Sequence, residues 1–222
     1  MINRYFKIRT LQVVFLNLFF SVALPTHADD FQVTVKDTQG GVSHHAVVEL
    51  QPLFDDDWSD VTPVVSQMKQ QDALFTPFVM AVQTNTPVSF PNLDEFRHQV
   101  YSYSKAKKFE LRLYGKDESK KVVFDKRGIV SLGCNIHDNM LAYIYVTDGP
   151  YFAVADSKGI AEFSTVRPGK YQLSIWHPDQ KNRRQNYTQP VTITADSIEM
   201  SATIELRSIR RKQRPPESDE YQ

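Results

Sequence analysis

From residue 31 onward, the chain consists of short segments in which apolar and polar residues alternate. Such alternation puts every second side chain on one face of a β-strand, and clusters of Pro, Asn, Asp, Gly or Lys separate the segments. No segment shows a sustained helical period. The expected strands are 31–36, 46–50, 80–83, 88–90, 99–103, 109–114, 122–124, 141–146, 151–155, 160–163 and 171–176, with two more near 191 and 204. The sequence therefore predicts an all-β fold made of β-sandwiches.

Length and composition limit the class of protein. The 222 residues suffice for one or two domains with real cores, and a hydrophobic content of 41% is typical of globular chains. Acidic and basic residues balance at 26 each, so nothing indicates a nucleic-acid partner. The single cysteine excludes an intramolecular disulfide.

Residues 1–28 have the pattern of a signal peptide. Three basic residues precede an apolar run over 13–24, and Thr26-His27-Ala28 offers a cleavage site. The run is shorter than the about 20 residues that span a bilayer. No Arg-Arg pair is present, so we expect Sec-type export and a periplasmic protein. A retained membrane anchor is the alternative.

One short segment concentrates metal-ligating side chains. Cys134, His137 and Met140 follow the spacing Cys-x2-His-x2-Met, and His98 lies upstream. One thiolate, two imidazoles and one thioether form the ligand set of type 1 (blue) copper, with the sulfur of Met as a weak axial ligand. The sequence predicts one copper ion, cycling between Cu(I) and Cu(II), held by these four residues.

A simpler interpretation of Cys134 is a buried apolar residue, because free cysteines are among the most buried residue types. In an exported protein, however, an unpaired thiol is oxidised unless it is buried or ligated. The two histidines and the methionine that accompany Cys134 favour ligation.

These residues belong to a wider resemblance. The matching features are Phe75-Thr-Pro77, the stretch from Thr86 to Asn92 that leads to His98, and the stretch from Gly128 to Leu132 that leads to Cys134, His137 and Met140. With them, residues 64–147 resemble the cupredoxin family, and the loop spacing is similar to that of amicyanin. The chain also looks like exported proteins labelled methylamine utilization proteins. The resemblance implies a Greek-key sandwich that binds one copper ion for electron transfer.

Two features depart from that family's pattern. Gln99 follows His98, where the family usually has an Asn that ties strands together. The amicyanin-type loop carries prolines near its second His, whereas this loop has Asn135, Ile136, Asp138 and Asn139. Both departures concern the rigidity of the loop and the copper potential, and neither removes a ligand.

A second domain surrounds the first in sequence. Residues 29–55 look like the opening hairpin of a carboxypeptidase regulatory-like (transthyretin-like) domain. The continuation of that pattern, Asp156 to Gly159 followed by Pro168-Gly169-Lys170-Tyr171, appears only within 149–206. We therefore predict a smaller transthyretin-like sandwich that is split by the inserted cupredoxin domain. The alternative is that residues 31–53 are further strands of the cupredoxin.

Other candidates are weaker. Adjacent residues on a strand point to opposite faces, so His44 and His45 are expected to be exposed turn residues rather than a transient copper site. Asp55-Asp56-Asp57 lacks the spacing of a calcium loop and is expected in a linker. A structural role is expected for His177, and disorder for the tail 207–222.

The function follows from the ligand set. An ion whose positions are filled by protein has no vacancy for a substrate, so we expect no enzyme. A copper oxidase or nitrite reductase would need further histidines, and no His-x-His pair is present. We expect a carrier of single electrons between periplasmic redox partners. The resemblance implies a dehydrogenase or a c-type cytochrome as partner and His137 as the exposed exit, near Ile136 and Leu141. The alternative is a periplasmic copper-binding or interaction module without electron shuttling.

Overall fold

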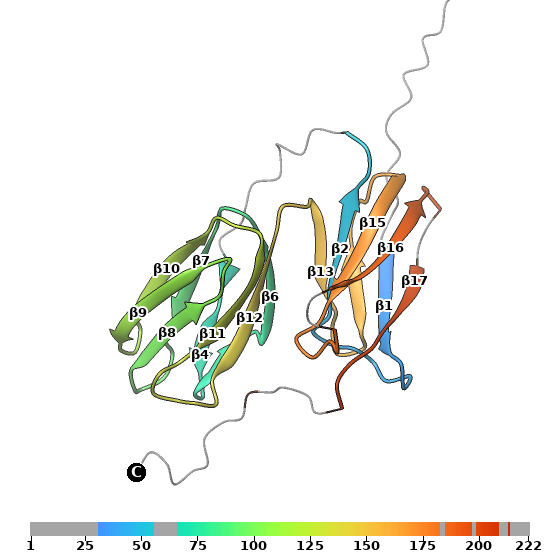
Figure 1. The fold of residues 1–222 in the computed structure, drawn as a ribbon. Coiled ribbons are helices and arrows are strands. Elements are labelled where there is room, and N and C mark those ends of the chain that lie inside the picture. Colours follow the sequence, from blue (N-terminus) through green and yellow to red (C-terminus); the bar gives the residue numbers. More distant parts are fainter. Residues whose placement is uncertain (1–30, 56–65, 183–184, 197–198, 209–212, 214–222) are drawn as a thin grey trace, which may run out of the picture.

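The computed structural model describes residues 31–55, 66–182, 185–196, 199–208 and 213 (Figure 1). All regular secondary structure in this part of the chain is β, in strands β1 to β17, which confirms the all-β prediction. None of the described residues belongs to a helix long and apolar enough to cross a membrane. The expected signal peptide 1–28, most of Asp55-Asp56-Asp57 and most of the tail 207–222 lie outside the described residues.

Strands β3 to β12 form the first of two sandwiches, on the left in Figure 1. Its larger sheet has the order β6-β12-β11-β8-β9, its smaller sheet the order β10-β7-β3, and β4 and β5 pair as a separate hairpin. The strands are β3 (Ser66–Gln67), β4 (Lys69–Gln71), β5 (Leu74–Thr76), β6 (Val79–Gln83), β7 (Thr86–Pro91), β8 (His98–Tyr103), β9 (Lys108–Tyr114), β10 (Ser119–Phe124), β11 (Gly128–Gly133) and β12 (Leu141–Thr147).

Alternation along these strands builds one apolar core between the two sheets. The inward residues of β12 are Ala142, Ile144 and Val146, as the sequence pattern predicts. They pack with Val100, Val130 and Leu132 of the same sheet and with Val88 and Phe90 of the facing sheet. The short strands β3 to β5 were not expected from the sequence, because they are brief and rich in polar residues.

The second sandwich contains β1, β2 and β13 to β17, on the right in Figure 1. One sheet has the order β14-β1-β17 and the other the order β13-β2-β15-β16. The strands are β1 (Phe31–Asp37), β2 (Val47–Pro52), β13 (Tyr151–Val154), β14 (Ile160–Phe163), β15 (Gly169–Trp176), β16 (Tyr187–Ile193) and β17 (Glu199–Ile204).

Two separate chain segments thus build the second sandwich. Strands β1 and β2 pair only with strands from β13 onward, and Phe31 lies opposite Phe163 in the register of β1 and β14. The hairpin expected over 29–55 is wrong, because β1 and β2 lie in different sheets and the connection between them crosses from one sheet to the other. The expected domain boundaries and the transthyretin-like resemblance stay predictions.

The turn that opens β14 explains part of the sequence pattern. The Asp156 carboxylate accepts hydrogen bonds from the backbone N–H groups of Lys158 and Ile160, at 2.8 and 2.9 Å. Gly159 has φ +77°, and a Cβ there would lie 2.7 Å from the carbonyl oxygen of Val35. Only glycine fits a left-handed position that lies so close to another strand.

The two sandwiches share an apolar interface. Strand β12 is buried on both faces, because Tyr143 and Tyr145 point away from the first core and pack with Val47 of β2 and Val79 of β6. The Trp176 ring of β15 lies 5.6 Å from the Tyr143 ring and 5.9 Å from the Tyr145 ring, between ring centroids. The strand that follows the predicted metal loop therefore belongs to two packed interfaces.

A buried carboxylate also joins the sandwiches. Glu49 of β2 is 0% exposed and accepts hydrogen bonds from the Tyr145 hydroxyl at 2.7 Å and the Arg127 guanidinium at 3.0 Å. The Thr147 hydroxyl also donates to Glu49. All three donors belong to the first sandwich. A buried charge is tolerated when it is paired and hydrogen-bonded in this way.

Candidate metal centre

Three of the four predicted ligands meet at one end of the first sandwich. His98 is the first residue of β8, Cys134 directly follows β11, and His137 lies in the loop that leads to β12. Strands β8 and β11 are neighbours in the larger sheet, with Gly133 opposite Tyr101. Pairing of these strands brings the upstream histidine to the loop.

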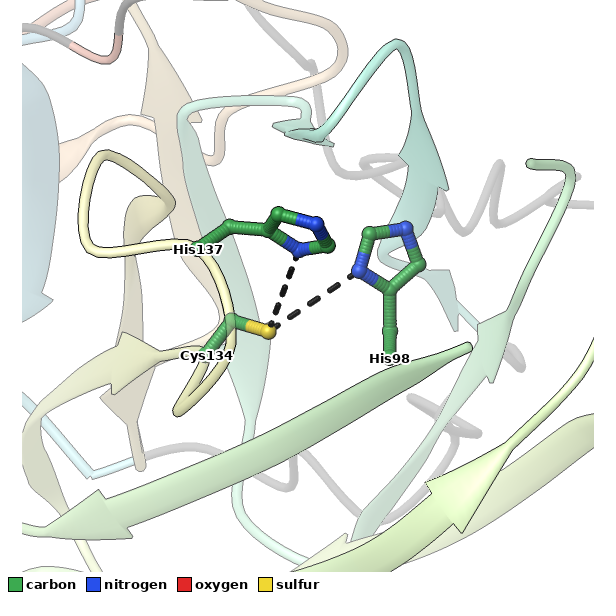
Figure 2. Close-up of side chains that lie close together, drawn as sticks. All are labelled: His98, Cys134 and His137. Atoms are coloured by element: carbon green, nitrogen blue, oxygen red, sulfur yellow. Dashed lines mark hydrogen bonds between the residues drawn. The ribbon is translucent and has the colours of Figure 1, made fainter. Parts of the chain in front are cut away.

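The ligand atoms converge in the core. The Cys134 Sγ lies 3.8 Å from His98 Nδ1 and 3.7 Å from His137 Nδ1 (Figure 2). The three side chains form a metal-ligating group whose atoms lie within 4.8 Å of one another. His98, Cys134 and His137 are 0%, 3% and 5% exposed. Water is therefore largely excluded from the group.

The two sulfur–nitrogen distances fit a single ion held by the three side chains. Bonds of about 2.3 Å to a thiolate and about 2.0 Å to an imidazole, as at zinc sites, separate trigonal ligand atoms by about 3.7 Å. The two sulfur–nitrogen distances, 3.7 and 3.8 Å, match this value. One thiolate and two imidazoles also suit copper chemically.

Asp94 fixes the orientation of His98. Its carboxylate lies 2.7 Å from His98 Nε2, on the side of the ring opposite the sulfur. An Nε2–H that donates to Asp94 leaves the lone pair of Nδ1 directed at Cys134. A carboxylate that selects the tautomer of a ligating histidine is common at metal sites.

Backbone N–H groups of the turn between β4 and β5, together with the side chain of Asn92, hold Asp94 in place. Its carboxylate accepts the backbone N–H groups of Asp72 at 2.7 Å and Ala73 at 3.0 Å. The Asn92 side chain accepts the Asp94 N–H at 2.9 Å and donates to the Phe96 carbonyl at 2.8 Å. The sequence analysis missed Asp94. A carboxylate four positions before a ligating histidine was the available signal, although it is too common to be decisive.

The environment of Cys134 favours the thiolate. Burial, the largest single effect, raises the pKa of the Cys134 thiol, but its hydrogen bonds together outweigh burial, and the bond with His98 contributes most to the resulting lowered pKa. Backbone N–H groups of Gln99, Ile136 and His137 lower the pKa of Cys134 further. The thiolate is the form that binds metal.

The two imidazoles differ in charge preference. Burial lowers the pKa of His98, but hydrogen bonds with Cys134 and Asp94 outweigh burial, so that the pKa is raised. For His137, burial and the nearby His98 lower the pKa. Because a ligating imidazole must be unprotonated at its binding nitrogen, the raised pKa of His98 makes metal binding more favourable as pH increases.

Met140 lies beside the group as the last residue of the loop. It is 2% exposed, and its backbone N–H donates to the His137 carbonyl at 3.0 Å. This hydrogen bond closes the loop into a tight turn. The axial role of the Met140 thioether stays a prediction.

The residue after His98 joins the loop to the sheet, although it is not the expected asparagine. The Gln99 carbonyl oxygen of the side chain accepts from Asn135 at 3.1 Å, and its amide nitrogen donates to Glu110 of β9. A longer side chain therefore spans loop and strand, as the family's asparagine is expected to do.

Among the described residues, the remaining histidines, His44, His45 and His177, lie between the sandwiches. His44 and His45 form a turn, as expected from the sequence, with His44 exposed and His45 half-buried, and their ring centroids are 4.2 Å apart. His177 has the structural role expected of it. Its Nδ1 accepts the Asp179 N–H at 2.9 Å, and its Nε2 lies 3.1 Å from the His44 carbonyl.

Two residues of the expected tail contact the body of the protein. Arg207 forms an ion pair with Asp179 at 2.7 Å. The Gln213 side chain bonds both backbone groups of Phe75 at 2.6 Å and accepts the Leu141 N–H at 3.3 Å. Leu141 directly follows Met140, so this contact supports the end of the metal loop.

Comparison with known proteins gives distant structural neighbours. No protein-family model matches the chain, and no curated protein matches it. A purple cupredoxin from Nitrosopumilus maritimus is 17% identical, with 37% of this chain and 99% of that one covered and a TM-score of 0.34. Amicyanin from Paracoccus versutus is 14% identical, with 45% of this chain and 97% of that one covered and a TM-score of 0.35.

A third neighbour is a copper-containing nitrite reductase from Thermus scotoductus. It is 24% identical, with 44% of this chain and 25% of that one covered and a TM-score of 0.37. This chain therefore spans about a quarter of the reductase. Because identities and TM-scores are low throughout, the proposal below rests on the geometry of the site itself.

Proposed function

We propose that the chain is a type 1 copper protein that carries single electrons. The observation that supports this most is the buried group of Cys134, His98 and His137, with sulfur–nitrogen distances of 3.7 and 3.8 Å. Met140 completes the proposed ligand set from the same loop. With four protein ligands there is no open position for a substrate, so the proposal is a carrier and not an enzyme.

The residues of the chain have separate tasks in this proposal. Cys134 supplies a thiolate that its backbone donors stabilise, and Asp94 holds His98 with its ligating nitrogen toward the sulfur. A bound copper ion would supply the one-electron couple between Cu(II) and Cu(I). The side chains around it limit how far the ligands move when the charge changes.

The rigidity of the site has structural causes. The loop is tied to β9 through Gln99, closed by the hydrogen bond from Met140 to His137, and continued by β12, which is packed on both faces. Ligands that keep one geometry in both oxidation states exchange electrons with little rearrangement. Such a preorganised site suits an electron carrier.

The proposed route for electrons leads through His137. His137 is 5% exposed, whereas the preceding residue, Ile136, is 48% exposed. An apolar side chain is therefore exposed next to His137 in the loop. We propose that a redox protein docks here, such as a dehydrogenase or a c-type cytochrome. We also propose that the protein is exported and acts in the periplasm.

The test begins with copper loading of the purified chain. Cu(II) should produce an intense thiolate-to-copper absorption band in the visible region. Cys134→Ser should abolish this band, while Tyr103→Phe, an exposed position outside the ligand set, should leave it unchanged. A wild-type chain that binds Cu(II) tightly and stays colourless would refute the type 1 assignment.

Voltammetry then separates a carrier from a copper-binding module without shuttling. The loaded chain should show a reversible one-electron couple at an electrode, and Met140→Leu should shift its potential. If the band is present and the couple is irreversible, the chain binds copper and does not carry electrons.

A further inference from the structure

The turn between β1 and β2 places two imidazoles side by side. His45 has a left-handed backbone, with φ 70°, which turns its side chain toward that of His44. The ring centroids are 4.2 Å apart, whereas neighbours on an extended strand would point to opposite faces. A non-glycine residue in this conformation carries strain, so the surrounding structure must hold the pair in place.

The surroundings of the pair hold it without engaging its ring nitrogens. The His45 ring packs edge-on against Phe78 at 5.2 Å between centroids, and the His45 N–H donates to the Ala155 carbonyl at 3.0 Å. Within the described residues, no hydrogen bond involves a ring nitrogen of His44 or His45. By contrast, both ring nitrogens of His177 have partners. The pair therefore offers unused nitrogen ligands.

The pair also separates two hollows between the sandwiches. A cavity of 440 Å³ is lined by Ser43, His44, His45 and His177, and one of 470 Å³ by His44, His45, Asp156 and Ser157. The Ser43 hydroxyl is buried, with 1% residue exposure, and has no hydrogen-bond partner among the described residues. Oxygen donors thus lie around the two imidazoles on both sides.

We propose that His44 and His45 form a second metal site, which takes Cu(II) through their imidazole nitrogens and is separate from the Cys134 group. Imidazole is a ligand of copper, zinc and nickel, and Cu(II) binds most strongly among the divalent first-row ions. Water and the nearby oxygen donors complete the coordination. The site lies in the connection between β1 and β2 of the second sandwich. It requires none of the residues of the metal loop.

The charge state of His45 agrees with this assignment. Burial and the neighbouring His44 and His177 lower the pKa of His45 to about 4. At neutral pH the ring is therefore unprotonated, and a metal ion does not have to displace a proton from it.

The site can be tested in the full chain carrying Cys134→Ser, which removes the thiolate of the other group. Cu(II) is added below one equivalent while amide signals are followed by NMR, because a bound paramagnetic ion broadens signals of nearby residues. We expect broadening at residues 42–46 and 155–157. If broadening is confined to the metal loop or to the chain's N-terminus, the site does not exist.

Removal of the imidazoles provides the second test. His44→Asn and His45→Asn together should abolish the broadening at 42–46. They should also weaken Cu(II) binding by at least about tenfold. Affinity falls by that much when a ligating residue loses only the group that supports it, so loss of the ligands themselves should cost no less. Unchanged affinity and an unchanged broadening map would overturn the proposal. If the double variant does not fold, the map of the parent chain decides by itself.

Discussion

Replacement of Asp94 by asparagine tests how the site is oriented. The carboxylate accepts three hydrogen bonds, from His98 Nε2 at 2.7 Å and from the N–H groups of Asp72 at 2.7 Å and Ala73 at 3.0 Å. Asparagine has nearly the same shape but only one acceptor oxygen. If the asparagine side chain is oriented so that its oxygen still accepts from His98 and Ala73, its NH2 group faces the Asp72 N–H and that hydrogen bond is lost.

The expected magnitudes follow from these contacts. Loss of one hydrogen bond to a charged group should lower the free energy of unfolding of the metal-free chain by about 1.5–3 kcal/mol. Loss of the carboxylate behind a ligating histidine should weaken metal affinity by about 10- to 100-fold. That range corresponds to about 1.4–2.7 kcal/mol in binding free energy.

Competition with a Cu(I) chelator measures the affinity, and urea unfolding of the metal-free chain measures the stability. Asp125→Asn is the matched control, because Asp125 is exposed and its carboxylate forms an exposed ion pair with Lys107. The control should change neither quantity by much, since exposed ion pairs contribute little. If Asp94→Asn lowers stability and leaves copper affinity within twofold of the parent, Asp94 supports the fold and does not orient His98.

Three further predictions concern packing, the interface and pH. A Cβ at position 133 would lie 2.7 Å from Cζ of Tyr101, so Gly133→Ala should lower stability by about 1–3 kcal/mol in urea, unless Tyr101→Ala accompanies it. Glu49→Gln should cost about 2–4 kcal/mol and separate the unfolding of the sandwiches, because Arg127 loses its negative partner and one of the two acceptor oxygens becomes an NH2 group; a single unshifted transition contradicts this. The pKa of His45 is lowered from 6.5 to about 4, so the unfolded chain binds the proton more readily. Stability should fall as pH drops between these values, and His45→Gln should flatten that dependence.

The metal group could be predicted because most of its ligands lie in one short segment. Cys134, His137 and Met140 need only a single turn to lie near one another, and a strand start supplies His98. Asp94 could not be predicted in the same way. Its position depends on the turn that Asn92 stabilises and on N–H groups of a distant hairpin, and neither leaves a pattern in the sequence.

Burial of both faces of β12 also exceeds what alternation can predict. The inward positions were evident, whereas Tyr143 and Tyr145 are amphipathic and fit a solvent-exposed face equally well. What covers them is the second sandwich, whose contacts are not encoded locally. Likewise, the turn at His44 and His45 was expected, whereas the left-handed φ of His45 and the close approach of the two rings were not.

Strands β3 to β5 were missed for a different reason. Their segments are short and polar, and Gln70 of β4 is buried although it is a residue type usually found outside. Its amide donates to the Phe90 carbonyl at 3.3 Å and to the Tyr114 hydroxyl. Tertiary hydrogen bonds thus make strands of residues that have little preference for them.

The split second sandwich sets an order in which its parts become available as the chain emerges N-terminus first. Strands β1 and β2 emerge first, but all their partners in the described part of the chain, β13 to β17, come last. Gln32 and Glu162, which meet across β1 and β14, are 130 positions apart. In this interval β3 to β12 can pair among themselves. The apolar strands β1 and β2 meanwhile have unpaired edges, which can associate with other chains. The strands that flank the metal loop can therefore pair while β1 and β2 still lack their partner strands.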